Sequence, residues 1–307
     1  MKSPLTFLAS LALCLAIVGC GAPAAPTEGT TLTYKDQTFT VSARPQRIAV
    51  LTTPLLNMVY AVGGTAIARP ITETPIPDEA RNVTELGTPQ HIDMEKLVSL
   101  SPDFVLGGQT QNGKLEPLLQ SNQIPYLLVN YDGIHDNIPL LQFLGALCGT
   151  EDQAARVCAE YERRMEAARA LAASQEPARI AILRATGKDV TAETPTAICA
   201  SMAEYLGMDN VITSHRDMSF ANKTVPYSLE QLSADDPDIL FIVTMGRADA
   251  INQKLDQSMR SNPAWAHLKA VQTDRVYFLP SDLFLLNPGI RTPDALEMLC
   301  RLAYPDA

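Results

Sequence analysis

Two short apolar runs with the same pattern stand far apart in the chain. Residues 47–51 read Arg-Ile-Ala-Val-Leu and residues 179–183 read Arg-Ile-Ala-Ile-Leu, an offset of 132 residues between Arg47 and Arg179. Short runs of this kind, rich in β-branched residues, are typical of buried strands. The pattern predicts the first strand of each of two similar units.

A second pair of landmarks follows in the same order. Residues 94–97 lead to a Pro-Asp step and a new apolar run at 102–106, and residues 229–232 lead in the same way to 237–241, an offset of 135 residues between Met94 and Leu229. Strands that alternate with helices predict a mostly parallel sheet. The sequence therefore predicts two α/β lobes.

The stretch between the two units, residues 137–174, has a helical period. Gln153 follows Thr150 at the spacing of a capping box, which predicts a helix that starts after Thr150 and ends before Pro177. Apolar side chains recur at intervals of three and four, at Ala154, Val157, Cys158, Tyr161, Met165, Ala168 and Leu171. A helix over residues 151–173 would be roughly 35 Å long, enough to connect two lobes.

Composition supports a globular protein with two cores and argues against a nucleic-acid partner. The chain has 307 residues, 46% of them apolar, and a formal charge of −10. A chain of this length can bury two hydrophobic cores. An acidic chain has no basic stripe with which to neutralise phosphates, so we expect no binding to nucleic acid.

The first residues have the pattern of an export signal. Lys2 precedes an apolar run that is too short for a membrane span, and the run ends in Ile-Val-Gly-Cys at Cys20, which resembles a bacterial lipoprotein signal. We expect a signal peptide at 1–19, a lipidated Cys20 with a tether at 20–31, and a protein anchored to the extracytoplasmic face of the membrane. The alternative is an ordinary secretory signal with Cys20 as a thiol.

Four further cysteines, Cys148, Cys158, Cys199 and Cys300, lie outside this segment. Three disulfide pairings are possible, and buried free thiols are an equal alternative. Their spacing does not fit a structural zinc site.

Several motifs resemble one known family. Residues 86–97 read Leu-Gly-Thr-Pro-Gln-His-Ile-Asp-Met-Glu-Lys-Leu, Pro102-Asp103 follows, and Tyr227-Ser228-Leu229-Glu230 is the counterpart in the second half. Together with residues 262–277 and 283–289, these motifs are similar to the substrate-binding proteins of ABC importers for iron-siderophores, haem and cobalamin. The resemblance extends over about residues 31–305.

This resemblance implies two Rossmann-like lobes with mostly parallel sheets joined by one long α-helix, the class III periplasmic-binding-protein fold. The lobes would be residues 32–136 and 175–307, with the connecting segment 137–174 between them. It also implies a monomer that carries no cofactor of its own. Glu95 and Glu230 would dock into arginines of a membrane permease, which works with an ATPase.

In parallel sheets, ligands bind at the carboxyl ends of the strands, so the loops there should line a cleft. These loops include residues 87–91, 107–111 and 281–287. They supply hydroxyl and amide groups, cations, and apolar groups that could cover a planar ligand. The candidate ligand-binding residues are Thr52, Thr53, Gln90, His91, Gln109, Arg184, Lys188, Met245, Arg247 and Phe284.

The resemblance also bears on the ligand. Gln90 stands where the haem-binding branch has a methionine ligand, and Met245-Gly246-Arg247 stands where that branch has a histidine. His91 or Met245 could replace them as haem ligands. We therefore expect a ferric siderophore-type complex as the transported ligand, with haem as the alternative and cobalamin third.

Two other classes of protein fit the sequence less well. A zinc or manganese receptor would use His91, Asp93 and Glu95, but the chain has only four histidines and no histidine-rich loop. An enzyme is not expected, because the usual nucleophile, zinc-protease and phosphate-binding motifs do not occur.

Overall fold

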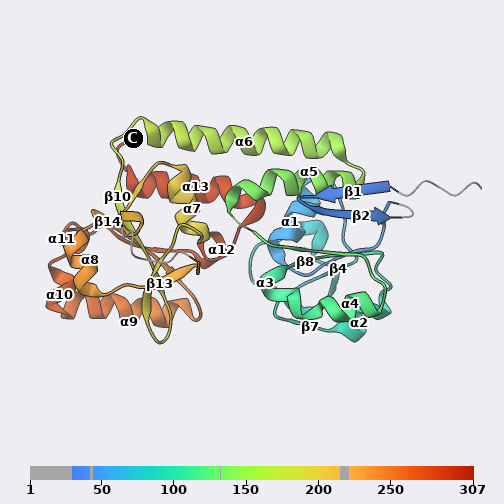
Figure 1. Ribbon diagram of the computed structural model, residues 1–307, viewed down its shortest axis with the longest axis horizontal. Helices are drawn as coiled ribbons and strands as arrows, with labels where there is room; N and C mark the ends of the chain where they lie inside the picture. The colour runs from blue at the N-terminus through green and yellow to red at the C-terminus, as the bar shows by residue number, and fades with distance from the viewer. Residues whose placement is uncertain (1–29, 42–43, 132, 215–220) are drawn as a thin grey trace, which may run out of the picture.

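A computed structural model describes residues 30–41, 44–131, 133–214 and 221–307. They form two lobes that lie side by side and are spanned by one long helix (Figure 1). Within these ranges no helix is both long and apolar enough to cross a membrane. The expected signal peptide and the lipidation of Cys20 fall outside the described residues.

The N-terminal lobe is built on a parallel sheet with the strand order β5-β4-β3-β8-β9. Ile48 and Val50 belong to one hydrophobic core, while Ala49 and Leu51 belong to another, so this part of the sheet is buried on both faces. The strands are β3 (Ile48–Val50), β4 (Ala68–Arg69), β5 (Thr84–Glu85), β8 (Phe104–Gly108) and β9 (Tyr126–Val129). The helices are α1 (Thr53–Ala61), α2 (Met94–Ser99), α3 (Gln109–Asn112) and α4 (Glu116–Ser121).

Two small ladders accompany this lobe. Strands β1 (Thr30–Tyr34) and β2 (Gln37–Val41) form a hairpin. Its Phe39 packs against Phe104 of the sheet and against Phe143 of α5 (Asn137–Cys148). The second ladder joins β6 (Gly87–Thr88) to β7 (His91–Ile92).

The C-terminal lobe has a mixed sheet. Its order is β13-β11-β10-β14-β15, with β12 also paired to β10; β11 and β13 run antiparallel and the other pairs are parallel. The strands are β10 (Arg179–Ala185), β11 (Val190–Glu193), β12 (Asp209–Asn210), β13 (Thr224–Pro226), β14 (Ile239–Thr244) and β15 (Val276–Leu279). The helices are α7 (Ile198–Tyr205), α8 (Leu229–Asp235), α9 (Ala248–Ser261), α10 (Pro263–Ala266), α11 (Lys269–Gln272), α12 (Ser281–Phe284) and α13 (Thr292–Ala303). The predicted fold class, two α/β lobes with mostly parallel sheets and one long helix, is confirmed.

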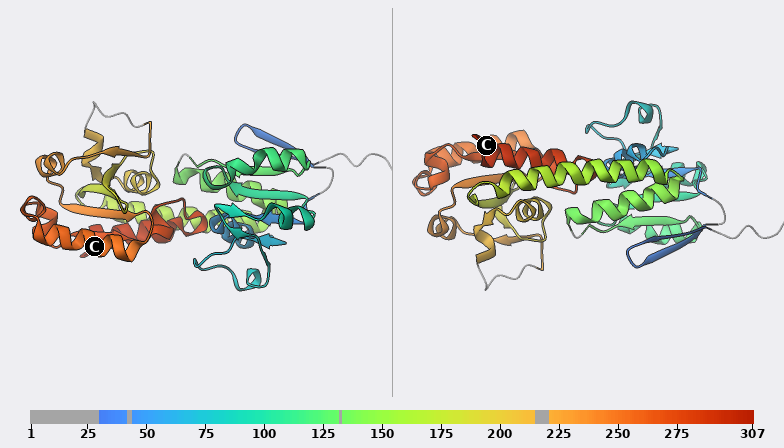
Figure 2. Two further views of the ribbon diagram at one scale, coloured as in Figure 1. Left: turned by 90° about the horizontal axis from the view of Figure 1, so that it is seen from below. Right: turned by 90° about the horizontal axis from the view of Figure 1, so that it is seen from above.

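The connector consists of two helices, α5 (Asn137–Cys148) and α6 (Glu151–Ala173), and the predicted bounds of α6 are confirmed. Figure 2 shows α6 passing over both lobes. Gly149 separates the two helices at φ 70°, a left-handed conformation that favours glycine. Since the N-terminal sheet ends before this connector and the C-terminal sheet begins after it, we propose lobe boundaries at residues 136 and 174.

The expected capping box at the start of α6 is wrong. Thr150 is the N-cap residue, but its ψ of 37° is not the extended conformation that brings a hydroxyl onto the first amides. Its hydroxyl is buried without a partner among the described residues. Gln153 instead accepts hydrogen bonds from Arg156. One position of the predicted apolar stripe of α6 also differs, because Leu171 is 38% exposed and its neighbour Ala172 is buried instead.

The last part of the chain returns to the junction between the lobes. Gly289 lies so close to Met58 of α1 that a β-carbon there would stand 3.0 Å from the Met58 sulfur. The Asn137 side chain donates hydrogen bonds to the Tyr161 hydroxyl (2.8 Å) and to the Thr292 hydroxyl (2.9 Å). Since α5 also packs on α1 and β1, this buried polar cluster lies where the connector joins the two lobes.

All four cysteines of the described residues are free thiols, which settles the alternative left open above. Burial raises the pKa of Cys148 and of Cys300 to about 11. Thiols with a raised pKa are poor nucleophiles at neutral pH.

Candidate ligand-binding site

A pocket of about 170 Å³ lies between the lobes. Its N-terminal wall comes from the first turn of α1, from the loop after β4 and from residues 89–90 and 111, and its C-terminal wall comes from residues 281–291. Most of the lining side chains carry hydroxyl or amide groups, and Asp282 and Arg291 are the charged ones. The pocket therefore lies at carboxyl ends of strands in both lobes, where the sheet topology led us to expect it.

The first turn of α1 presents two threonines to this pocket. β3 ends at Val50, Thr52 is the N-cap of α1, and Pro54 is the second residue of the helix, where its missing amide costs no hydrogen bond. Thr52 and Thr53 are each only 6% exposed. Their hydroxyls have no hydrogen-bond partner within the described part of the chain, although both side chains line the pocket.

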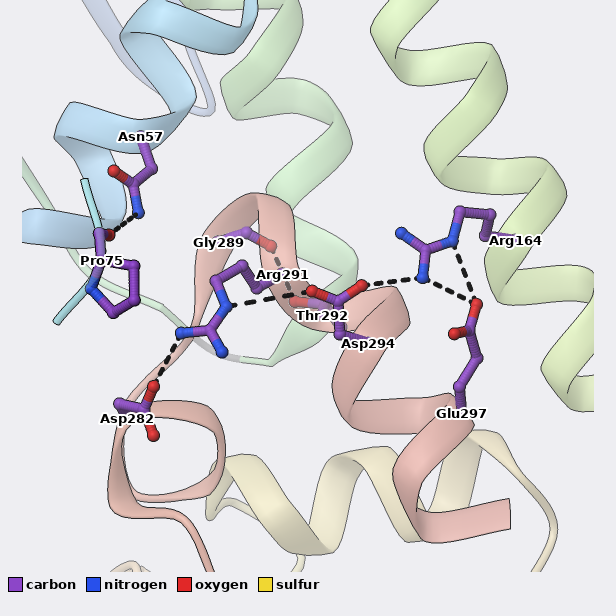
Figure 3. Close-up of polar contacts among 9 residues, drawn as sticks. All are labelled: Asn57, Pro75, Arg164, Asp282, Gly289, Arg291, Thr292, Asp294 and Glu297. Atoms are coloured by element: carbon purple, nitrogen blue, oxygen red, sulfur yellow. Dashed lines mark hydrogen bonds and ion pairs between the residues drawn. The ribbon is translucent and has the colours of Figure 1, made fainter. Parts of the chain in front are cut away.

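The opposite wall carries a charged pair. Arg291 donates from Nη1 to Asp282 Oδ2 at 2.7 Å, and its Nε lies 3.9 Å from Asp294 Oδ2 (Figure 3). Asp294 also pairs at 2.7 Å with Arg164 of α6, which pairs in turn with Glu297 at 2.8 Å. A chain of charges thus connects the pocket wall to the long helix.

Three of the predicted candidates, Thr52, Thr53 and Gln90, line this pocket together. Gln109, also a candidate, is exposed, and Gln111 from the same turn lines the pocket instead.

The predicted cations of the C-terminal lobe do not line the pocket. Arg184 donates two hydrogen bonds to Glu193 Oε1, at 2.6 and 2.9 Å. Lys188 borders a separate cavity of about 470 Å³ between the β10–β11 turn and α9. Met245 is 54% exposed and Arg247 is exposed, and neither is part of the pocket wall.

Phe284 requires a correction. Its side chain is fully buried in the hydrophobic core with Leu283 and Leu296, so it offers no face to a ligand. Residues 281–284 form the short helix α12, which turns this side chain inward; Leu286, 45% exposed, lines the pocket instead.

His91 is exposed on β7 and borders a shallow surface depression with Lys96 and Lys114, outside the pocket between the lobes. Asp93 does not join it in a metal site, because its carboxylate accepts a hydrogen bond from the Lys96 amide at 2.9 Å and so caps α2. No group of three or more His, Cys, Asp or Glu side chains among the described residues is placed to hold a metal ion.

Glu95 and Glu230 occupy matching places in the two lobes. Each is exposed and is the second residue of a short helix, after the N-cap Asp93 in α2 and the N-cap Ser228 in α8. Ser228 and Gln231 form a complete capping box. The internal repeat seen in the sequence therefore extends to the position of these two carboxylates.

Sequence reasoning missed four polar residues of the pocket. Asn57 is in the second turn of α1, and Thr72 and Thr74 follow β4, a two-residue strand too short to show a periodic pattern. Arg291 lies four positions beyond the loop that was predicted to line the cleft. The Pro288-Gly289 turn before it was the one available signal, since it folds the chain back toward α1.

Two α/β lobes, one spanning helix and a polar pocket between them define a two-lobe binding protein. The profile of the family described as Periplasmic binding protein matches residues 48–283, which is more than half of the chain, and the chain belongs to that family.

Similar proteins are known from several bacteria. The chain is 24% identical over 263 residues to the Fe(3+)-citrate-binding protein YfmC of Bacillus subtilis, covering 83% of this chain and 79% of that protein. It is 21% identical over 241 residues to the high-affinity heme uptake system protein IsdE of Staphylococcus aureus, covering 78% of this chain and 81% of that protein. The crystal structure of an ABC transporter substrate-binding protein from Listeria monocytogenes has a TM-score of 0.76 at 21% identity, covering 86% and 100%. The fold is thus that of ABC-transporter binding proteins.

Proposed function

We propose that this protein is the extracytoplasmic binding protein of an ABC importer, and that it captures a ferric complex of the siderophore type between its lobes and delivers it to a membrane permease. The observation that carries this proposal is the polar pocket between the two lobes of a chain that belongs to the periplasmic binding protein family. Its similarity to a Fe(3+)-citrate-binding protein supports iron as the cargo. Capture and release need no covalent step, so we propose no enzymatic activity.

Haem is the second candidate ligand, favoured by the similarity to a heme uptake protein. Haem iron needs an axial side chain such as His, Met, Tyr or Cys. None of these side chains lines the pocket among the described residues, and His91 and Met245 both lie outside it. Its volume of about 170 Å³ is also below the roughly 300–1,000 Å³ usual for pockets of drug-sized ligands. Both facts favour a smaller chelate.

We propose that Glu95 and Glu230 dock the loaded protein onto the permease, one carboxylate from each lobe. Both side chains are exposed and neither has an ion-pair partner among the described residues, so they are free to meet arginines of another protein. We further propose that the protein acts as a monomer held at the membrane by lipid on Cys20.

The test combines binding and uptake. Purified protein that begins after Cys20 is titrated with ferric complexes and with haem by calorimetry, and uptake of radioactive iron is measured in cells that carry the full-length protein. We expect one equivalent of a ferric complex to bind. Glu95→Ala combined with Glu230→Ala should bind as tightly as wild type but import far more slowly. Unchanged uptake in the double variant would remove the docking role, and the absence of binding to any iron complex would remove the proposed function.

A further inference from the structure

We infer that the pocket between the lobes is an anchor for a carboxylate group, formed by the first turn of α1 on one side and by Arg291 on the other. This inference rests on the proposed function and narrows the ligand to an iron complex that carries carboxylates. None of the cations predicted from the sequence takes part in it.

The N-terminal half of the anchor is the start of α1. Thr52 and Thr53 line the pocket and are each only 6% exposed, and their hydroxyls have no hydrogen-bond partner among the described residues. The amides of Thr53 and Leu55 likewise have no acceptor in that part of the chain, and Pro54 between them has no amide. Unpaired amides and the positive end of a nine-residue helix favour an anion at this place.

The C-terminal half is the guanidinium group of Arg291. One of its terminal nitrogens is held by Asp282, and its Nε faces Asp294 at 3.9 Å, so its position is fixed from two sides. The second terminal nitrogen, Nη2, has no hydrogen bond in the described structure (Figure 3). A guanidinium held in this way can still donate to a carboxylate.

The rest of the wall selects for the same class of ligand. The remaining polar groups are neutral and come from residues such as Asn57, Gln90, Gln111 and Asn287, which suit hydroxyl and carbonyl oxygens. Among the described residues, no aromatic side chain lines the pocket to stack on a catechol or porphyrin ring. With about 170 Å³, the pocket fits a small chelate, or one carboxylate arm of a larger one.

Two of the four iron complexes in the experiment carry carboxylates, and the experiment separates them. Ferric citrate supplies carboxylates on a small chelate, and haem supplies them as propionates. A tris-hydroxamate complex, ferrioxamine B, and an iron tris-catecholate complex have none. Each is titrated by calorimetry into wild type, Arg291→Gln, Arg291→Lys and Thr53→Val. Arg163→Gln is the matched control, since among the described residues Arg163 forms an ion pair only with Glu160, on the exposed side of α6.

We expect ferric citrate to bind best. Arg291→Gln should weaken it by about 10- to 100-fold, Arg291→Lys less, and Thr53→Val by about 3- to 10-fold, while Arg163→Gln binds like wild type. Affinity should fall as salt rises, with a smaller slope in Arg291→Gln. Circular dichroism and thermal unfolding verify that each variant is folded.

Each result has one meaning. If haem binds and the variants weaken its affinity in the same order as for ferric citrate, the anchor is supported, with the haem propionates as the carboxylates that it binds. Preferred binding of the hydroxamate or catecholate, or ferric citrate binding that Arg291→Gln leaves unchanged, overturns the inference and leaves the proposed function standing. Failure of folded wild type to bind any of the four complexes overturns both.

Discussion

The first strand of each lobe starts from nearly the same five residues and ends in a different way. In the N-terminal lobe, β3 runs through Thr52 directly into α1, whose first turn faces the pocket. In the C-terminal lobe, β10 turns back as the antiparallel strand β11, and Arg184 near its end faces Glu193 of that strand. The same strand sequence therefore gives a binding surface in one lobe and an internal ion pair in the other.

The difference teaches that the residue type at the end of a strand does not decide its role. Arg184 is a plausible ligand contact only if the chain after it leaves the sheet, as it does after β3. Since β11 pairs with β10 instead, the Glu193 carboxylate, which is fully buried, takes the guanidinium as its partner. A buried carboxylate without a partner would cost several kcal/mol of stability, so the guanidinium pairs with Glu193 rather than with a ligand.

The largest expected effect comes from breaking this pair. Arg184→Gln should lower the free energy of unfolding by about 3–5 kcal/mol at neutral pH, because it leaves a buried charge without a partner. Urea unfolding followed by Trp265 fluorescence measures it. Thr53→Val, at the corresponding strand end of the other lobe, should stay near wild-type stability. Equal stability of Arg184→Gln and wild type would mean that Glu193 does not depend on this partner.

The same variant has a pH signature. Burial raises the pKa of Glu193, and Arg184 opposes that rise. A carboxyl group whose pKa is raised by folding contributes stability at low pH and loses that contribution as pH rises through the raised value. Without Arg184 the rise is larger, so wild type and Arg184→Gln lose stability in parallel until pH passes the raised pKa that Glu193 has in wild type, and the deficit of the variant should grow above that pH. A deficit that is constant with pH would contradict this.

Much of the fold follows from the sequence, because strand runs and the α6 period are local patterns, although the cap expected at Thr150 does not form. Residues 151–173 show this best, since their apolar stripe faces the core that both lobes share. Fewer residues of the pocket could be predicted from the sequence. Thr52, Thr53 and Gln90 were found because strand ends are readable, whereas Arg291 reaches the pocket only through the contact of Gly289 with Met58. Phe284 and Arg184 were misplaced because burial depends on partners far away in the chain.

An intermediate effect is expected at the junction where the two lobes meet. Asn137→Ala removes the hydrogen bonds to the hydroxyls of Tyr161 and Thr292 and should cost about 1–3 kcal/mol. Trp265 lies in the C-terminal lobe, so its fluorescence reports the unfolding of that lobe, whereas far-ultraviolet circular dichroism reports both lobes. If the lobes no longer unfold together in this variant, the two signals should change at different urea concentrations. Asn122→Ala, which removes an exposed side-chain hydrogen bond to Leu118, is the control. Coincident transitions at the wild-type midpoint would show that this cluster does not couple the lobes.

The smallest effect is expected where the two lobes agree most closely, at the caps of α2 and α8. Asp93 accepts from the Lys96 amide and Ser228 from the Gln231 amide, so Asp93→Ala and Ser228→Ala should each cost about 1 kcal/mol in thermal or urea unfolding. Exchanging the caps as Asp93→Ser and Ser228→Asp keeps an acceptor at each position and should stay near wild type. If the exchange were as costly as the alanine changes, the two helix starts would not be equivalent. The two lobes would then share a sequence pattern at this place but not the same stabilisation of the helix start. Glu95 and Glu230 would no longer occupy equivalent positions.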